Sequence, residues 1–102
     1  MKIINQHINQ IVSLCQKNKV YSLFAFGSVI TNSFRDESDI DLVVDINDDD
    51  PVSFTEKYFN LKFQLEELLK RKIDLLELKA IRNRFLKDEI DRTKIQVYEE
   101  RN

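Results

Sequence analysis

The chain has very little cysteine, glycine or proline: one of each in 102 residues, and no tryptophan. A single cysteine cannot form an internal disulfide bond or a cysteine-based zinc site, so the composition indicates a reducing compartment. The length suits one modest hydrophobic core, and we expect a single domain over residues 1–102.

Charge of one sign and long apolar runs are also lacking. The net charge is −2, with 33% charged residues, which gives no basic footprint for non-specific nucleic-acid binding. No stretch has the apolar length needed to span a bilayer, and residues 1–6 lack the hydrophobic region of a signal peptide. We therefore expect a soluble, cytoplasmic protein with neither a membrane nor a nucleic acid as partner.

The hydrophobic pattern alternates between helical and strand periods along the whole chain. It predicts helices over residues 3–18, 51–71 and 80–92, and strands over residues 20–26, 39–46, 73–78 and 95–98. A short helix is also expected to begin at Gly27. This order predicts an α/β (α+β) domain, with one sheet covered by helices.

Several details of the helices can be predicted as well. Ser53 and Glu56 have the spacing of a capping box, which indicates the start of the second long helix. In the last helix, Ile81, Phe85 and Ile90 are expected to point inward. We expect His7 to be exposed and inert and Cys15 to be a core residue. The aromatic residues of the second long helix wrap more than one side of it, which predicts either a partner surface or burial on two sides: Phe54, Tyr58, Phe59 and Phe63.

Two carboxylates at alternate positions are the first chemical signal. Asp39 and Asp41 begin an apolar run that reads as a strand, so both should point to one face and repel each other. A divalent cation relieves such repulsion, and hard oxygen ligands suit Mg²⁺. Asp74 interrupts another apolar strand. If the two strands are neighbours, the three carboxylates would form a site for two metal ions, an arrangement that serves displacement at phosphorus.

The second signal is a phosphate-binding corner ten residues before Asp39. Gly27 is the only glycine and, with Ser28, follows an apolar strand, which indicates a backbone requirement and a tight turn. A phosphate corner facing metal-binding carboxylates suggests phosphoryl or nucleotidyl transfer. Ser38 is expected to be a turn residue whose hydroxyl orients the carboxylates, and Ser38 and Arg35 are both candidate nucleotide or phosphate contacts.

The pattern Gly27-Ser28, ten residues, Asp39-x-Asp41, followed by Asp74 on a later strand, resembles the polymerase-β nucleotidyltransferase superfamily. Size and the C-terminal segment make the chain similar to its minimal nucleotidyltransferase (MNT) family, the antitoxins of HEPN–MNT toxin–antitoxin pairs. The resemblance implies a small polymerase-β-like fold with a mixed sheet of about four strands. It also implies metal-dependent transfer of AMP from ATP to a hydroxyl, expected on a tyrosine, of a cognate HEPN-type toxin in a hetero-oligomer.

The same resemblance implies roles for individual residues. Gly27 and Ser28 would hold the triphosphate, Asp39 and Asp41 would bind Mg²⁺, for which Mn²⁺ can substitute, and Asp74 would be the third acid that helps deprotonate the nucleophile. The chain departs from many relatives after the Gly-Ser pair: an arginine is often found where this chain has Val29, and a glycine where it has Asn32.

Two other functions are weighed beside transfer to a protein. The chain could be a non-catalytic antitoxin that neutralises its partner by binding alone, which the departures at Val29 and Asn32 favour slightly. It could modify a small molecule, but enzymes of that kind carry an extra helical domain, and 102 residues leave no room for one.

Overall fold

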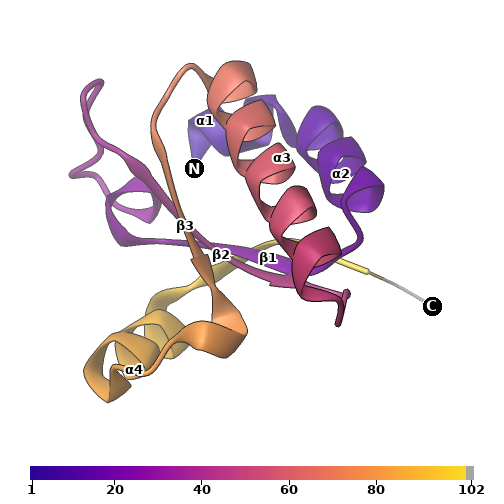
Figure 1. Cartoon of the computed structure of the whole chain (residues 1–102). Helices are drawn as coiled ribbons and strands as arrows, with labels where there is room; N and C mark the ends of the chain where they lie inside the picture. The colour runs from indigo at the N-terminus through magenta and orange to yellow at the C-terminus, as the bar shows by residue number, and fades with distance from the viewer. Residues whose placement is uncertain (101–102) are drawn as a thin grey trace.

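The computed structural model describes residues 1–100 and alternates helices and strands along the chain (Figure 1). The elements are α1 (Lys2–Gln6), α2 (Ile8–Lys17), β1 (Val20–Phe26), the 3₁₀ helix η1 (Gly27–Ile30), β2 (Ile40–Ile46), α3 (Pro51–Leu69), β3 (Ile73–Glu77), the 3₁₀ helix η2 (Leu78–Ala80), α4 (Arg84–Thr93) and β4 (Ile95–Glu99). Within this range, no helix has both the length and the hydropathy to cross a membrane.

The four strands form one mixed sheet in the order β3-β2-β1-β4. β1 pairs antiparallel with both β2 and β4, whereas β2 pairs parallel with β3. A parallel pair needs a long crossover, and α3 supplies it between β2 and β3. The mixed four-stranded sheet confirms the predicted fold class.

The main core lies between one face of the sheet and the first three helices, which Figure 1 shows on the same side of the sheet. Alternate residues of β2 enter this core, and so do those of the helical stripes on α2 and α3: Ile40, Leu42, Val44, Ile46, Ile11, Cys15, Leu61, Leu65 and Leu69. Cys15 is fully buried, as predicted, and this burial raises its pKa to about 12. A thiol with such a pKa stays protonated and unreactive.

The opposite face of the sheet has a different cover. The residues of β2 between the core positions are Asp41, Val43 and Asp45, and they point away from the main core. Figure 1 shows α4 on this side of the sheet. Val43 and Ile90 of α4 are both fully buried outside the main core. A small second apolar layer therefore supports the face that carries Asp41.

The first helix is divided at His7, where a single helix over residues 3–18 is predicted. The His7 ring donates a hydrogen bond from Nδ1 to the carbonyl oxygen of Ile3 (2.9 Å), and its backbone N–H donates to Ile4 (3.1 Å). The ring thus occupies the Ile3 carbonyl oxygen, which the backbone N–H of His7 would use if the α-helix continued. His7 is half-buried rather than fully exposed, which corrects the expectation.

Two other helix details differ from the prediction. α3 is capped by Asp50, whose Oδ2 accepts from the backbone N–H of Ser53 at 2.9 Å, so the predicted capping box at Ser53 and Glu56 is not used. Pro51 occupies the first helical position, so the helix begins at residue 51 as predicted, although its cap differs. α4 begins at Arg84, and Phe85 in its first turn is 88% exposed, so the expectation that Phe85 points inward is wrong.

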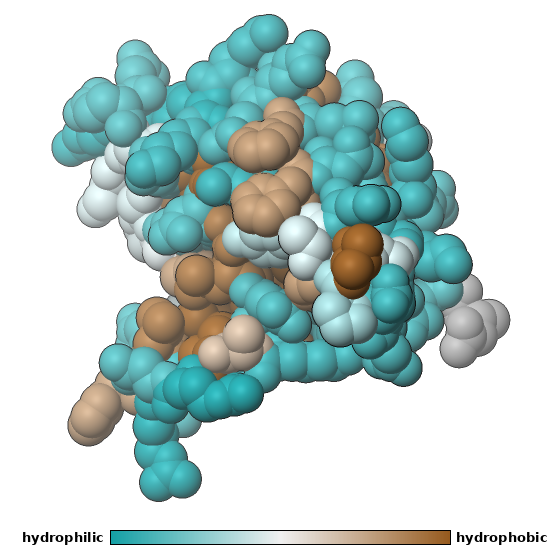
Figure 2. Space-filling model, in the orientation of Figure 1, coloured by the Kyte–Doolittle hydropathy of each residue, from teal (hydrophilic) through white to brown (hydrophobic). Residues whose placement is uncertain are grey.

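The aromatic residues of α3 divide between its two sides. Phe54 and Tyr58 pack against the core. Phe59 and Phe63 remain 43% and 57% exposed and stack on each other, with ring centroids 5.7 Å apart. Figure 2 shows apolar side chains among polar ones over the outer side of this helix. Burial of the aromatic residues on both sides of the helix is therefore wrong.

Candidate active site

Asp41 and Asp74 lie directly opposite each other on neighbouring strands. They are partners in the parallel register of β2 and β3, one step from the buried pairs Ile40–Ile73 and Leu42–Leu75. Because those neighbours enter the main core, both carboxylates project from the other face of the sheet. Asp41 is half-buried and Asp74 is exposed. The adjacency predicted for Asp74 is thus present.

The pKa of Asp41 is affected by the carboxylates that lie close to it. Burial raises the pKa of Asp41, and the negative charges of Asp74 and Asp39, with a hydrogen bond to Asp74, raise it further. Each of these effects disfavours the ionised form of Asp41. The site therefore has an excess of negative charge that a bound cation would relieve.

Gly27 is required by its contact with Asp41. Its neighbour Phe26 pairs with Asp41 across β1 and β2, and Gly27 turns out of the strand with φ of +72°. A Cβ atom at Gly27 would overlap Asp41 Oδ2 and lie 3.3 Å from Asp41 Cγ. Only glycine satisfies both the left-handed backbone and the close approach of the carboxylate. The backbone requirement predicted at this residue is explained by these two features.

Ser28 follows in η1, the 3₁₀ turn that leaves β1. Its carbonyl oxygen accepts hydrogen bonds from the backbone N–H and the Oγ1 of Thr31, both at 2.9 Å. Its hydroxyl takes part in none of the hydrogen bonds formed among residues 1–100. The turn is therefore held by the backbone of Ser28, and the hydroxyl has no partner within this part of the chain.

Asp39 precedes β2 instead of beginning it, because the strand starts at Ile40. Its carboxylate is 47% exposed, and its Oδ2 lies 3.9 Å from Nζ of Lys72. From the sequence, Lys72 belongs to the basic run Lys70-Arg71-Lys72, which could contact a partner or a phosphate but is also typical of a helix end. The signal that identifies it is positional: Lys72 precedes β3 as Asp39 precedes β2, and parallel pairing of Ile40 with Ile73 brings the two residues together.

Ser38 and Arg35 form a turn before Asp39. Ser38 Oγ accepts from the backbone N–H of Arg35 at 3.0 Å, so its hydroxyl holds the loop. Arg71 braces this turn by donating from Nη1 to the carbonyl oxygens of Arg35 (3.0 Å) and Ser38 (2.8 Å), while its guanidinium lies 4.5 Å from the centre of the Phe34 ring. Ser38 thus has the expected turn role.

Arg35 is one of the residues that line a cavity of about 340 Å³ beside α1, together with Met1, Val29 and Phe34. None of the three candidate metal ligands lines this cavity. The structure therefore brings Asp41, Asp74, Asp39 and the Gly27 turn together, and Arg35 forms no ion pair with these acids among residues 1–100.

The departures at positions 29 and 32 have local explanations. Val29 is 1% exposed and packs in the main core, and the N-terminal amine of Met1 donates to its carbonyl oxygen at 3.1 Å. A side chain at this position faces the core. Asn32 is exposed, and the positive φ values among residues 1–100 belong to Lys19, Gly27 and Lys70. The turn therefore makes no demand for glycine at Asn32.

The donor set fits a magnesium ion by its chemistry, because Mg²⁺ prefers carboxylate oxygens. Asp41 and Asp74 share one place on the sheet, and the raised pKa of Asp41 indicates where positive charge is favoured. As the side chains lie, no group of three or more histidine, cysteine, aspartate or glutamate residues within 1–100 is arranged to hold a metal. Asp39 must turn from Lys72 to complete the set, and its exposed side chain has the room to do so.

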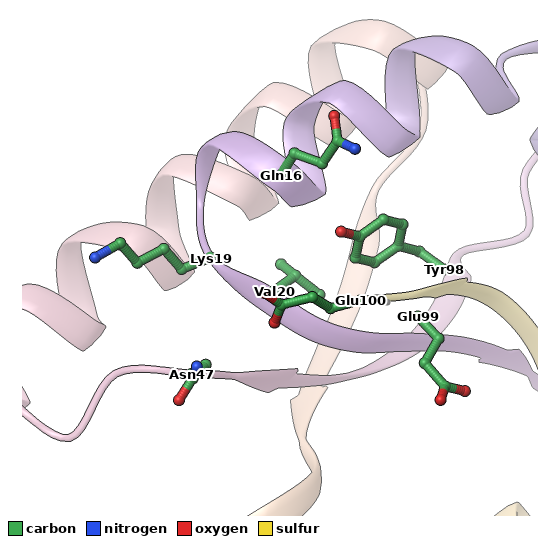
Figure 3. Close-up of a pocket in the computed structure, with 7 residues that line it drawn as sticks. All are labelled: Gln16, Lys19, Val20, Asn47, Tyr98, Glu99 and Glu100. Carbon is green, nitrogen blue, oxygen red and sulfur yellow. The ribbon is translucent and has the colours of Figure 1, made fainter. Parts of the chain in front are cut away.

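A larger cavity of about 650 Å³ lies elsewhere, near the start of β1 (Figure 3). Its lining comes from the end of α2, the start of β1 and the residues at the ends of β2 and β4: Gln16, Lys19, Val20, Asn47, Tyr98, Glu99 and Glu100. Val20 pairs with Ile46, whereas Phe26 at the other end of β1 pairs with Asp41. This cavity is therefore separate from the carboxylates.

Comparison with known proteins identifies the family of this site. Residues 9–102 match the family model described as "Polymerase beta, Nucleotidyltransferase". The chain belongs to this nucleotidyltransferase family. The Methanocaldococcus jannaschii protein named "Putative protein adenylyltransferase MJ1379" is 38% identical over 84 residues, which cover 82% of this chain and 83% of that protein.

Solved structures of minimal nucleotidyltransferases have the same fold as this chain. A structure described as "Crystal structure of the toxin-antitoxin with AMP-PNP" matches with a TM-score of 0.70 and 25% identity, covering 91% of this chain and 73% of that one. A complex of a tri-AMPylated HEPN toxin from Shewanella oneidensis with its MNT antitoxin matches with a TM-score of 0.64 and 24% identity, covering 94% and 72%. The second likeness bears on the fold alone. The resemblance to minimal nucleotidyltransferases is confirmed.

Proposed function

We propose that this nucleotidyltransferase moves AMP from ATP to a hydroxyl group of a protein partner and thereby acts as an antitoxin. The observation that carries the proposal is the register pairing of Asp41 with Asp74 beside the Gly27 turn, because it joins a carboxylate cluster to a phosphate-binding corner. The similarity to a protein named as an adenylyltransferase supports the reaction, and the similarity to a toxin–antitoxin structure with AMP-PNP supports the nucleotide.

The reaction assigns a role to each group. The Gly27-Ser28 turn holds the triphosphate through backbone N–H groups and the Ser28 hydroxyl. The acceptor oxygen attacks the α-phosphorus, the bond from that phosphorus to the bridging oxygen breaks, and pyrophosphate leaves with the bond's electron pair. Asp74 takes the hydroxyl proton as the new bond forms. Asp39, Asp41 and Asp74 would hold Mg²⁺ (two ions in the full set, with Mn²⁺ as a substitute), which supplies positive charge against the phosphate oxygens.

A protein acceptor is supported by the space around the site. Asp74 is exposed and Asp39 is nearly half exposed, and the two cavities described above contain none of the three acids. This open setting suits a partner that supplies the missing wall and brings its own hydroxyl. The likeness to a toxin–antitoxin structure supports a toxin as this partner and a hetero-oligomer as the assembly. A HEPN-type toxin and a tyrosine acceptor are what the resemblance to the MNT family implies. The use of ATP as donor suits the cytoplasm.

The proposal is tested by incubating the protein with ATP, Mg²⁺ and the candidate toxin and weighing the toxin by mass spectrometry. An added mass of AMP on a tyrosine, absent with EDTA and absent with Asp74→Asn, is the expected result. Ser33→Ala, which changes an exposed hydroxyl in the loop after η1, is the matched control and should leave the adduct unchanged.

The runner-up function is neutralisation by binding alone, and one observation favours it. As they lie, the three carboxylates do not form a ready metal site among residues 1–100, because Asp39 faces Lys72. The same experiment separates the two functions. If the toxin is neutralised without an adduct, and Asp74→Asn neutralises it equally well, binding alone is the function.

A further inference from the structure

Lys72 is the cation that the structure brings to the carboxylates. Among residues 1–100, it is the basic residue that forms an ion pair with one of the three acids, at 3.9 Å from Asp39 Oδ2. Its own carbonyl oxygen accepts from the backbone N–H of Ile40 at 3.0 Å, so the root of the side chain is fixed beside Asp39. Its side chain is nevertheless 72% exposed. The ammonium group is therefore tethered at the site but free to move.

The other basic residues near the site are already engaged. The guanidinium of Arg71 is held by the carbonyl oxygens of Arg35 and Ser38 and by the Phe34 ring. Lys79 pairs with Asp45 at 3.3 Å. Arg35 lines the cavity beside α1 and forms no ion pair with the three acids among residues 1–100. Of these basic residues, Lys72 is the one that contacts an acid of the site, so it is placed to meet the further negative charge of a triphosphate.

We propose that Lys72 is a further phosphate-binding residue of this chain, beside the Gly27-Ser28 turn, and that it exchanges Asp39 for the triphosphate when the nucleotide and its metal bind. This inference rests on the proposed nucleotidyl transfer and adds a residue to its site. An exposed ion pair at 3.9 Å contributes little to stability, so Lys72 leaves Asp39 at small cost. Once released, Asp39 turns to the metal, and the ammonium group, a mobile point charge, binds phosphate oxygens.

The exchange predicts opposite effects of one substitution on two ligands. Lys72→Gln removes the phosphate contact, so Mg²⁺-ATP should bind about tenfold more weakly, which corresponds to a lost hydrogen bond to a charged group. The same substitution removes the competitor for Asp39, so Mn²⁺ alone should bind equally well or about twofold more tightly. Lys72→Arg keeps the charge and should restore most of the affinity for Mg²⁺-ATP.

The experiment is calorimetry of Mg²⁺-ATP and, separately, of Mn²⁺ alone with the full chain. Lys70→Gln is the matched control, since it removes one positive charge from the same run at an exposed residue that caps α3 and forms no ion pair with a carboxylate among residues 1–100. The expected result is a loss for Mg²⁺-ATP with Lys72→Gln that Lys70→Gln does not share. Equal affinities in the two variants, or an equal loss for both ligands with Lys72→Gln, would overturn the inference.

Asp41→Asn in the same assay separates this inference from the proposed function. If Asp41→Asn removes metal-dependent ATP binding and Lys72→Gln does not weaken it, the site stands and the role of Lys72 is wrong. If Asp41→Asn also leaves ATP binding intact, the carboxylate site itself is wrong.

Discussion

Gly27 lies against the carboxylate of Asp41, so closely that a Cβ atom at residue 27 would overlap Asp41 Oδ2. The contact joins the turn expected to hold phosphates to the carboxylate expected to bind metal. Gly27 is the only glycine in the sequence. The geometry of the site therefore depends on the absence of one methyl group.

Gly27→Ala should both destabilise the protein and impair transfer. The left-handed backbone costs an L-residue about 1–2 kcal/mol, and the added methyl group displaces Asp41. We expect at least about a tenfold loss of AMP transfer, because small displacements of positioned groups are costly. Thermal unfolding and transfer rate are the measurements.

A double-mutant cycle isolates the contact from the backbone strain. With Asp41→Ala, the carboxylate is gone and the nearest remaining Asp41 atom, Cβ, lies at an ordinary 3.4 Å. Gly27→Ala should then cost less stability than it does in the native chain. Equal costs in both backgrounds would show that strain alone explains the glycine.

Asp41→Asn should stabilise the metal-free protein at neutral pH. Burial and the charges of Asp74 and Asp39 raise the pKa of Asp41 in the folded state above its unfolded value. The folded state therefore binds more protons above the unfolded pKa, and stability falls as the pH rises through the interval between the two values. The asparagine variant avoids this loss, so its advantage should be present at pH 7 and vanish below about pH 4.

The measurement is the melting temperature in EDTA across this pH range. Asp49→Asn, at an exposed residue of the turn before α3, is the control for the loss of one negative charge from the surface. A variant of Asp41 no more stable than the native chain at pH 7 would contradict the proposed crowding of charge.

Asp48→Asn should have the opposite pH dependence. Hydrogen bonds from Lys57, the Ser53 hydroxyl and the Asp50 backbone N–H lower the pKa of Asp48 in the folded state. Its contribution to stability is therefore fully present above the unfolded pKa and is lost as the pH falls toward the folded value. Asp48→Asn should lower stability at pH 7, and the deficit should shrink below about pH 4. Denaturant unfolding at both pH values, with Asp49→Asn as control, measures this; a deficit independent of pH would rule out the ion pair as its cause.

The carboxylate site could be predicted from sequence because its signals are local and periodic. Alternation places Asp41 between Ile40 and Leu42, and Asp74 between Ile73 and Leu75, so apolar neighbours reveal the side on which each acid lies. A lone glycine after a strand likewise indicates Gly27. What the sequence does not contain is the partner of Gly27, since its contact with Asp41 arises only when β1 and β2 pair.

The predictions that were wrong failed because they too depend on contacts formed only in the folded chain. Phe85 fits a helical stripe, yet α4 buries only Ile90, because one short helix covers this face of the sheet and no other element lies over Phe85 in the described range. His7 suits a continuous helix until its ring takes a backbone carbonyl. Lys72 looks like a helix-end residue until parallel pairing sets it beside Asp39. Each of these outcomes depends on contacts that periodicity does not encode.

Ser28→Ala should impair transfer less than the loss of a carboxylate. The Ser28 hydroxyl is free of partners among residues 1–100 and can donate one neutral hydrogen bond to a phosphate, worth about 1–1.5 kcal/mol, or roughly tenfold in rate. Asp39→Ala and Asp41→Ala remove metal ligands on which the position of every reacting group depends, and we expect losses on the order of a thousandfold. Transfer rates of the three variants, with melting temperatures to show that each is folded, test the ranking. A defect in Ser28→Ala as deep as that in Asp41→Ala would mean that the hydroxyl contacts the reacting phosphorus group itself, because a distant triphosphate contact cannot cost so much.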